Sequence, residues 1–155
     1  MVIAIIGVLA AIAISYPRED RATTRGFAEQ VVGELDVARM RAISSRRWHR
    51  VTVSGTQATI EAGDTVGMAM PTSWSLVGSF QAPNRTRIVA MATVTDIQDG
   101  GTDPDDGDGF DEVLLFAPDG SSVARTLYLS DPYDRAHYRV VVYRATGTSR
   151  VFDGW

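Results

Sequence analysis

The hydrophobic pattern of the chain changes near residues 17 and 48, and each change predicts a different kind of element. Residues 1–16 are uncharged and almost wholly apolar, whereas residues 17–47 carry apolar side chains three or four positions apart, the spacing of one helix face. From Trp48 onward, apolar and polar positions alternate with the period of two that half-buried strands show. The sequence therefore predicts an α+β fold, with one long helix laid across antiparallel sheets.

The second half of the predicted helix, residues 17–47, is amphipathic. One face is apolar and is expected to pack on the sheets, and charged residues mark a solvated surface around it. Pro17 is expected at a kink or in the first turn of this half. The residues predicted to make the helix–sheet packing are Phe27, Val31, Leu35, Ala38 and Ala42.

The remainder of the chain divides into short segments with strand periodicity, separated by turn residues. Gly55-Thr56 predicts a hairpin turn between the first two strands, and Pro118-Asp119-Gly120 predicts a second tight turn. The predicted strands are Trp48–Ser54, Gln57–Ala62, Leu76–Phe80, Arg87–Thr95, Glu112–Ala117, Ser122–Ser130, Tyr138–Arg144 and Arg150–Asp153.

The opening stretch MVIAIIGVLAAIAI lacks the basic residues that precede the apolar core of a secretory signal. Its length corresponds to a helix of roughly 21 Å, whereas hydrocarbon of about 30 Å needs about 20 residues. Small residues alternate with large ones, as in helices that pack closely in lipid. We therefore expect part of a membrane helix that continues upstream, with membrane or filament contacts made by Ile3, Ile5, Ile6, Gly7, Leu9, Ala10, Ile12 and Ile14.

VIAIIGVLAAIAI resembles the N-terminal helix of type IV pilins and type II secretion pseudopilins. The segments VLLFAPDGSS, ARTLYLS and YRVVVYRATGTSRV resemble the GspH/FimT group of minor pilins and pseudopilins, as does the helix-to-strand segment ELDVARMRAISSRRWHRVTVS. In that group a Phe-x-Pro-x-Gly turn precedes paired strands that end in a Thr-Gly turn. The residues that match this pattern are Phe116, Pro118, Gly120, Thr146 and Gly147.

The resemblance implies the type IV pilin fold, with an apolar half-helix at 1–16, an amphipathic half at 17–47 and a β-rich domain at 48–155. It also implies a structural subunit that assembles through its helix into a type IV pilus or a type II secretion pseudopilus, at initiation or at the tip. The implied partners are other pilin subunits, the bacterial inner membrane before assembly, and a prepilin peptidase whose site lies upstream of residue 1. The globular domain is then periplasmic on a single-pass anchor and becomes part of the filament after assembly.

Composition narrows the possible chemistry. The chain has no cysteine, which excludes disulfides, zinc-thiolate sites and thiol catalysis. The net charge is −4, which argues against general nucleic-acid binding. The histidines are His49 and His137, and neither lies in a nucleophile elbow, a phosphate-binding loop or a metalloprotease motif. We therefore predict that the protein is not an enzyme and has no certain cofactor.

The segment 96–112 holds eight carboxylates and is the strongest candidate for a cation site. Asp106, Asp108 and Asp111, with Gly109 among them, resemble part of a calcium loop. The full twelve-residue pattern is not met, because Pro104 and Leu115 stand where its first and last ligands belong. Two alternatives remain, a solvated acidic loop and a calcium site.

Arginines near the end of the helix suggest a second possible function, binding of nucleic acid. Some FimT-like pilins take up DNA through a Gly-Arg-x-Arg motif near the C-terminus, and the chain would then be a DNA-binding receptor pilin. Here the matching place reads Gly147-Thr148-Ser149-Arg150, and the absent first arginine argues against DNA binding. The other interpretation is a solvated helix end, where cations suit the helix dipole. The arginines concerned are Arg39, Arg41, Arg46, Arg47 and Arg50.

Overall fold

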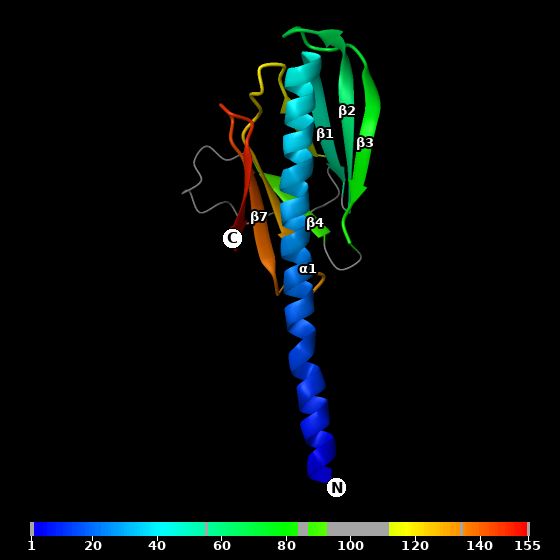
Figure 1. Cartoon of the computed structure of the whole chain (residues 1–155), viewed down its shortest axis with the longest axis vertical. Helices are drawn as coiled ribbons and strands as arrows, with labels where there is room; N and C mark the ends of the chain where they lie inside the picture. The colour runs from blue at the N-terminus through cyan, green and yellow to red at the C-terminus, as the bar shows by residue number, and fades with distance from the viewer. Residues whose placement is uncertain (1, 55, 84–86, 93–111, 134, 155) are drawn as a thin grey trace.

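The computed structural model describes residues 2–54, 56–83, 87–92, 112–133 and 135–154; for 2–20, 54, 87–92 and 112 it describes the backbone alone. One helix, α1 (Val2–Ser45), runs without interruption through Pro17. Figure 1 shows that the sheets lie behind and beside only the C-terminal half of α1, while the N-terminal half extends beyond them. The protein is thus a globular head carried on one end of a long helix.

Within the described residues, eight strands follow the helix and form two antiparallel four-stranded sheets. Sheet A has the order β3-β2-β1-β5, and sheet B has the order β4-β6-β7-β8. The strands of sheet A are β1 (Arg47–Ser54), β2 (Gln57–Val66), β3 (Trp74–Gln81) and β5 (Glu112–Phe116). Those of sheet B are β4 (Arg87–Ala92), β6 (Arg125–Ser130), β7 (His137–Val142) and β8 (Ser149–Asp153).

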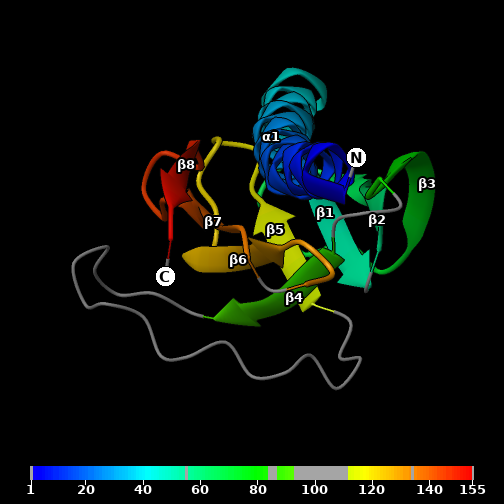
Figure 2. The same cartoon turned by 90° about the horizontal axis from the view of Figure 1, so that it is seen from below.

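Helix α1 joins the two sheets, because it packs against β1 of sheet A and against β7 and β8 of sheet B. Figure 2 looks along the helix and shows it lying over both sheets. The face predicted from the sequence, Phe27 to Ala42, is the buried one, and all five of its residues are at most 1% exposed. They share one core with Val51, Ile60 and Leu114 of sheet A and with Leu127, Leu129 and Val140 of sheet B.

The α+β prediction is confirmed, and each of the eight predicted strands is found, with ends displaced by a few residues. The β1–β2 hairpin pairs Ser54 with Gln57, as the turn at Gly55-Thr56 predicted. The strand predicted from Ser122 begins only at Arg125, because Ser122 makes a single isolated bridge to Phe116. The strand predicted to reach Arg144 ends at Val142, because the backbone turns there. Beyond Ala92, the strand predicted as Arg87–Thr95 lies outside the described residues.

Two turns meet beside the helix, one after β5 and the other between β7 and β8. In the first, the Gly120 N–H donates to the Ala117 carbonyl at 2.9 Å, as the Pro118-Asp119-Gly120 signal predicted. In the second, the Gly147 N–H donates to the Tyr143 carbonyl at 2.8 Å. Both glycines have positive φ, +86° and +60°. These turns hold the motif residues on which the family resemblance rests.

The contact between the two turns leaves no room for side chains. A Cβ added to Gly147 would lie 2.2 Å from the Gly120 carbonyl oxygen, and one added to Gly120 would lie 2.9 Å from Cδ1 of Ile43. Nε of Arg39 donates to the Gly120 carbonyl at 3.2 Å, and the Ser122 N–H donates to the Arg144 carbonyl at 3.0 Å. We call this meeting of Arg39, Gly120 and Gly147 the turn junction. It fixes sheet A, sheet B and α1 relative to one another.

Replacing Leu35 with alanine tests the shared core. Leu35 is fully buried between the helix and the sheets, so Leu35→Ala is expected to lower the free energy of unfolding by about 2–5 kcal/mol. Denaturant unfolding followed by circular dichroism measures the change. Gln30→Ala on the exposed side of the same helix is the control, with an expected effect within about 0.5 kcal/mol. Equal effects of the two substitutions would show that α1 does not pack as described.

A pair of glycine substitutions tests the turn junction. Gly147→Ala places a methyl group against backbone at a positive φ, so it is expected to destabilise the fold by about 1–3 kcal/mol. Gly26→Ala is the matched control, because its Cβ would meet open space on α1. Alanine favours helix over glycine by about 1 kcal/mol, so the control is expected to raise the melting temperature. A Gly147→Ala protein as stable as the wild type would refute the close contact.

Candidate functional site

The first candidate site is the apolar N-terminal half of α1. Its backbone is helical, which agrees with the element expected there. The side chains of the predicted membrane or filament residues, Ile3 to Ile14, lie outside those that the structure describes, so their roles stay predictions. Over the part of the chain open to description, no helix is both long and apolar enough to cross a bilayer.

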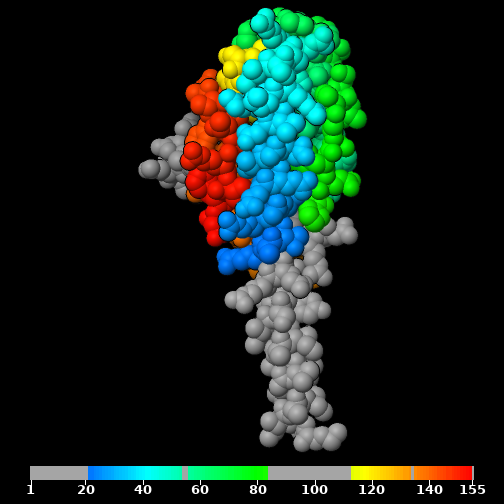
Figure 3. Space-filling view, in the orientation of Figure 1, coloured from blue at the N-terminus to red at the C-terminus, as the bar shows by residue number. Residues whose placement is uncertain are grey.

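The second half of α1 presents a further surface, on the side away from the sheets. Six residues at alternating spacings of four and three positions are all exposed, and we call them the outer face: Gly26, Gln30, Gly33, Val37, Met40 and Ser44. Val37 is 42% exposed and Met40 58% exposed, which is high for apolar side chains on a packed helix. In the space-filling view of Figure 3, this half of α1 forms the front of the head.

A shallow hollow lies on the outer face. Its lining residues are Asp36, Val37, Met40, Arg41 and Ser44, all from α1. The apolar side chains occupy the middle, with an acidic residue on one flank and a basic residue on the other. A surface of this kind suits contact with another protein, because it offers both hydrophobic burial and charge matching.

A second exposed apolar surface lies at the end of the head opposite the N-terminal half-helix, where β2 turns into β3 (Figure 1). Residues 65–84 carry no charge, and five of their large apolar side chains are exposed: Val66, Met68, Met70, Leu76 and Val77. β3 is also an edge strand of sheet A. Exposed apolar edge strands are sites of protein association.

The carboxylate of Asp64 orders the loop between β2 and β3. It accepts hydrogen bonds from the Thr72 N–H at 3.0 Å, the Thr72 hydroxyl at 2.7 Å and the Ser73 hydroxyl at 3.0 Å. The Trp48 indole N–H donates to the Met68 carbonyl at 3.2 Å. The hydrogen bonds from Thr72 and Ser73 favour the ionised form of Asp64, and the one from the Thr72 side chain does most to lower the pKa of Asp64 well below its usual range.

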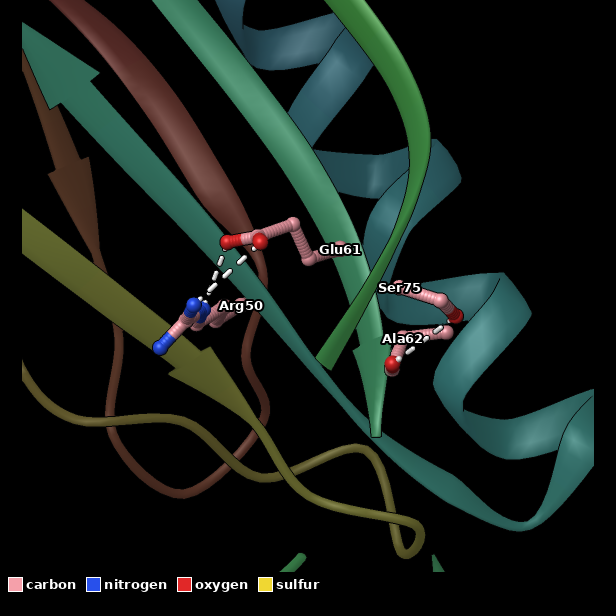
Figure 4. Close-up of polar contacts among 4 residues, drawn as sticks. All are labelled: Arg50, Glu61, Ala62 and Ser75. Atoms are coloured by element: carbon pink, nitrogen blue, oxygen red, sulfur yellow. Dashed lines mark hydrogen bonds and ion pairs between the residues drawn. The ribbon is translucent and has the colours of Figure 1, made fainter. Parts of the chain in front are cut away.

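Two of the five arginines near the helix end, Arg50 and Arg39, have structural partners in the head. Nε and Nη2 of Arg50 contact the two carboxylate oxygens of Glu61, at 2.5 and 3.2 Å, and the guanidinium stacks 4.6 Å from the centre of the Trp74 ring. Figure 4 shows this pair bridging β1 and β2, with the Ser75–Ala62 bond between β2 and β3 beside it. Arg39 belongs to the turn junction. The contact of Arg50 with Glu61 is that of a structural ion pair rather than a phosphate-binding groove.

The two histidines lie on different sheets, His49 on β1 and His137 on β7. His49 is only 2% exposed, with Nδ1 3.2 Å from the Arg47 carbonyl oxygen. Burial, reinforced by the positive charges of Arg41 and Arg47, lowers the pKa of His49. Its ring is therefore held mainly as the neutral form at pH 7, as expected for a core residue.

The acidic segment belongs to the parts of the chain that the structure leaves undescribed. Asp106, Asp108 and Asp111 fall within 93–111, so the calcium site stays a prediction. Among side chains that are described, no group of three or more His, Asp or Glu residues could hold a metal ion. What the described residues offer is surface for association, on the outer face and around β3.

Sequence reasoning found the buried face of α1 but missed its outer face and Asp64. The outer face has a period of 3.5, a pattern typical of helix pairing, but the sequence alone does not show that its residues are exposed. The carboxylate of Asp64 gave no comparable signal, because its partners are eight and nine residues away.

Acidification tests the role of Asp64. Its pKa is lowered in the folded chain, so ionised Asp64 stabilises the loop above its ordinary pKa of about 4. That contribution is lost as the pH falls towards the folded-state pKa. We expect Asp64→Asn to reduce hydrogen-exchange protection of the Thr72 amide at pH 6 but to matter less near pH 3. Equal protection in both proteins at pH 6 would contradict the assignment.

The solved structures that match this chain include two of the minor pseudopilin EpsH from the type 2 secretion system of Vibrio cholerae. One is 14% identical with a TM-score of 0.58, covering 84% of this chain and 96% of that chain. The other is 13% identical with a TM-score of 0.60, covering 87% and 97%. At these identities the likeness shows the fold alone, a helix on antiparallel sheets. No match is found among curated proteins.

Comparison with family models gives a match to GspH, described as type II transport protein GspH, over residues 28–147. The match takes in α1 from Ala28 onward, strands β1 to β7 and the turn junction, which is well over half of the chain. It includes the motif residues Phe116, Pro118, Gly120, Thr146 and Gly147 that carried the resemblance seen in the sequence. The chain belongs to the GspH family of type II transport proteins.

Proposed function

We propose that the protein is a minor pseudopilin, a structural subunit that assembles with other pseudopilins into the periplasmic filament of a type II secretion system. The observation that carries the proposal is the division of α1. One half packs under both sheets, and the other extends beyond them with an apolar sequence (Figure 1). A helix of this design can be stored in the inner membrane and later packed among like helices, where its apolar surface is buried again.

Several observations support this role. GspH family membership relates the chain to type II transport, and its fold is that of EpsH, itself a minor pseudopilin. The described histidines lie apart on different sheets, and His49 is buried as a core residue. The proposed domains follow the sequence prediction: a membrane and filament-core half-helix at 1–16, an amphipathic half at 17–47 and a periplasmic head at 48–155. The proposed processing enzyme is a prepilin peptidase acting upstream of residue 1.

The proposed place of the subunit is at initiation or at the tip of the filament, as the family resemblance implies. DNA binding is not part of the proposal. At the turn between β7 and β8, Thr148 stands where the DNA-binding motif has its first arginine. The neighbouring Gly147 is closed against the Gly120 carbonyl and offers no open cradle.

Charging the apolar half-helix tests the proposal. In the organism that encodes the protein, deletion of the gene is expected to leave type II substrates in the periplasm, and the full chain is expected to restore their secretion. Leu9→Asp places a carboxylate in the half-helix at a cost of roughly 2.5–3.5 kcal/mol at a membrane centre. We expect this variant to leave the membrane fraction and to fail in complementation.

Ala22→Asp is the matched control, because it puts the same side chain at an exposed position of α1 beside the head. It is expected to fractionate with membranes and to restore secretion. Normal secretion after deletion of the gene, or full complementation by Leu9→Asp, would overturn the proposed function.

A further inference from the structure

The outer face of α1 has the pattern of a helix that pairs with a parallel copy of itself. Its residues follow the alternating spacing of four and three that brings a seam of side chains against a partner helix. The core-facing residues Val31, Leu35, Ala38 and Ala42 lie on the opposite side of the helix and are buried. The seam is therefore separate from the packing that holds the head together.

The charges beside the seam favour an identical partner in parallel orientation. Asp36 directly precedes the seam residue Val37, and Arg41 directly follows the seam residue Met40. In a parallel pair, residues that flank the seam in this way lie across from each other, so Asp36 of each copy meets Arg41 of the other. Neither side chain has an ion-pair partner within the described part of the chain, so both are available.

One other flanking pair opposes this arrangement. Glu29 and Glu34 would face each other across the seam with like charges. Arg25 offsets this repulsion, since its Nε lies 3.1 Å from a carboxylate oxygen of Glu29. Gly26 and Gly33 lie in the same stretch of the seam, and Cβ atoms added there would meet open space. Two backbones can therefore approach closely at this end.

An antiparallel pair is disfavoured, because it would place Asp36 opposite Asp36 and Arg41 opposite Arg41. Membrane storage of the apolar half-helix also requires all copies to point the same way. The seam spans residues 26–44, a length of about 28 Å at ~1.5 Å per residue. A contact of this size is weak in free solution, and a shared membrane raises the effective concentration that it needs.

We propose that two copies of this chain pair in the membrane through the outer faces of their α1 helices, in parallel, with reciprocal Asp36–Arg41 ion pairs. The orientation of the pair rests on the flanking charges and on the proposed membrane anchoring, whereas its contact surface rests on the exposed residues of the head. The occupant of the hollow lined by Val37, Met40 and Ser44 is then the same surface of a second copy.

Disulfide cross-linking tests the pairing. The chain has no cysteine, so every disulfide between copies must come from the introduced thiol. Met40→Cys in the full chain, expressed in membranes and oxidised mildly, is expected to form linked dimers at least about tenfold faster than a control thiol, because pairing raises the effective thiol concentration. The control is Ala145→Cys, which is exposed on the turn between β7 and β8. Equal rates for the two variants would overturn the proposal.

A charge exchange tests the orientation. In the Met40→Cys background, Arg41→Asp is expected to reduce cross-linking several-fold, because Asp36 of each copy then faces an aspartate at position 41 of the other. Adding Asp36→Arg is expected to restore it, since the reciprocal pairs are re-formed with their signs exchanged. No loss with Arg41→Asp, or no recovery with the double exchange, would overturn the parallel seam. Thermal melting of each variant checks that the head is folded.

Failure of this proposal can be distinguished from failure of the proposed function. Cross-linking and fractionation are scored on the same samples, in whichever fraction holds the chain. A membrane-bound chain that restores secretion but does not cross-link at Met40→Cys overturns the pairing alone. A chain that cross-links but is absent from membranes overturns the anchoring and leaves the contact surface standing.

Discussion

The architecture depends on the backbone contact between Gly120 and Gly147 beside Arg39. The two sheets share one helix, and the turns that follow β5 and β7 meet beside it without side chains between them. The positive φ of both glycines and the short distance between the turns make this a constraint that other residues meet poorly. The motif glycines Gly120 and Gly147, which help to carry the family resemblance, therefore serve packing and not chemistry.

Much of the fold could be predicted from the sequence because its signals are local. The buried face of α1, from Phe27 to Ala42, follows from helical spacing, and the β1–β2 hairpin follows from its turn residues. Which sheet each strand joins could not be predicted, because that depends on contacts between distant residues such as Arg39 and Gly120, 81 positions apart. Strand ends shifted at Ser122 and Arg144 for the same reason.

The candidate surfaces were less accessible to sequence reasoning. An amphipathic helix is expected to have one apolar side. The sequence pattern therefore did not identify Val37 and Met40, which lie among polar residues, as a second apolar surface. Their exposure becomes informative only after the sheets are placed and the other side of α1 is seen to be filled. The Asp64 loop is a similar case, since its order depends on hydrogen bonds that close across a tight approach of Pro71 to Gly63.

The order of the strands along the chain bears on how the head can fold. After β3 the chain leaves sheet A to form β4 in sheet B, and it returns to sheet A with β5 before completing sheet B. Neither sheet is thus formed by a continuous stretch of sequence. β1 pairs with β5, which is synthesised about sixty residues later. Such interleaving raises the contact order and ties the two sheets into one cooperative unit. Neither sheet can be excised, and the head becomes complete only after β8 leaves the ribosome.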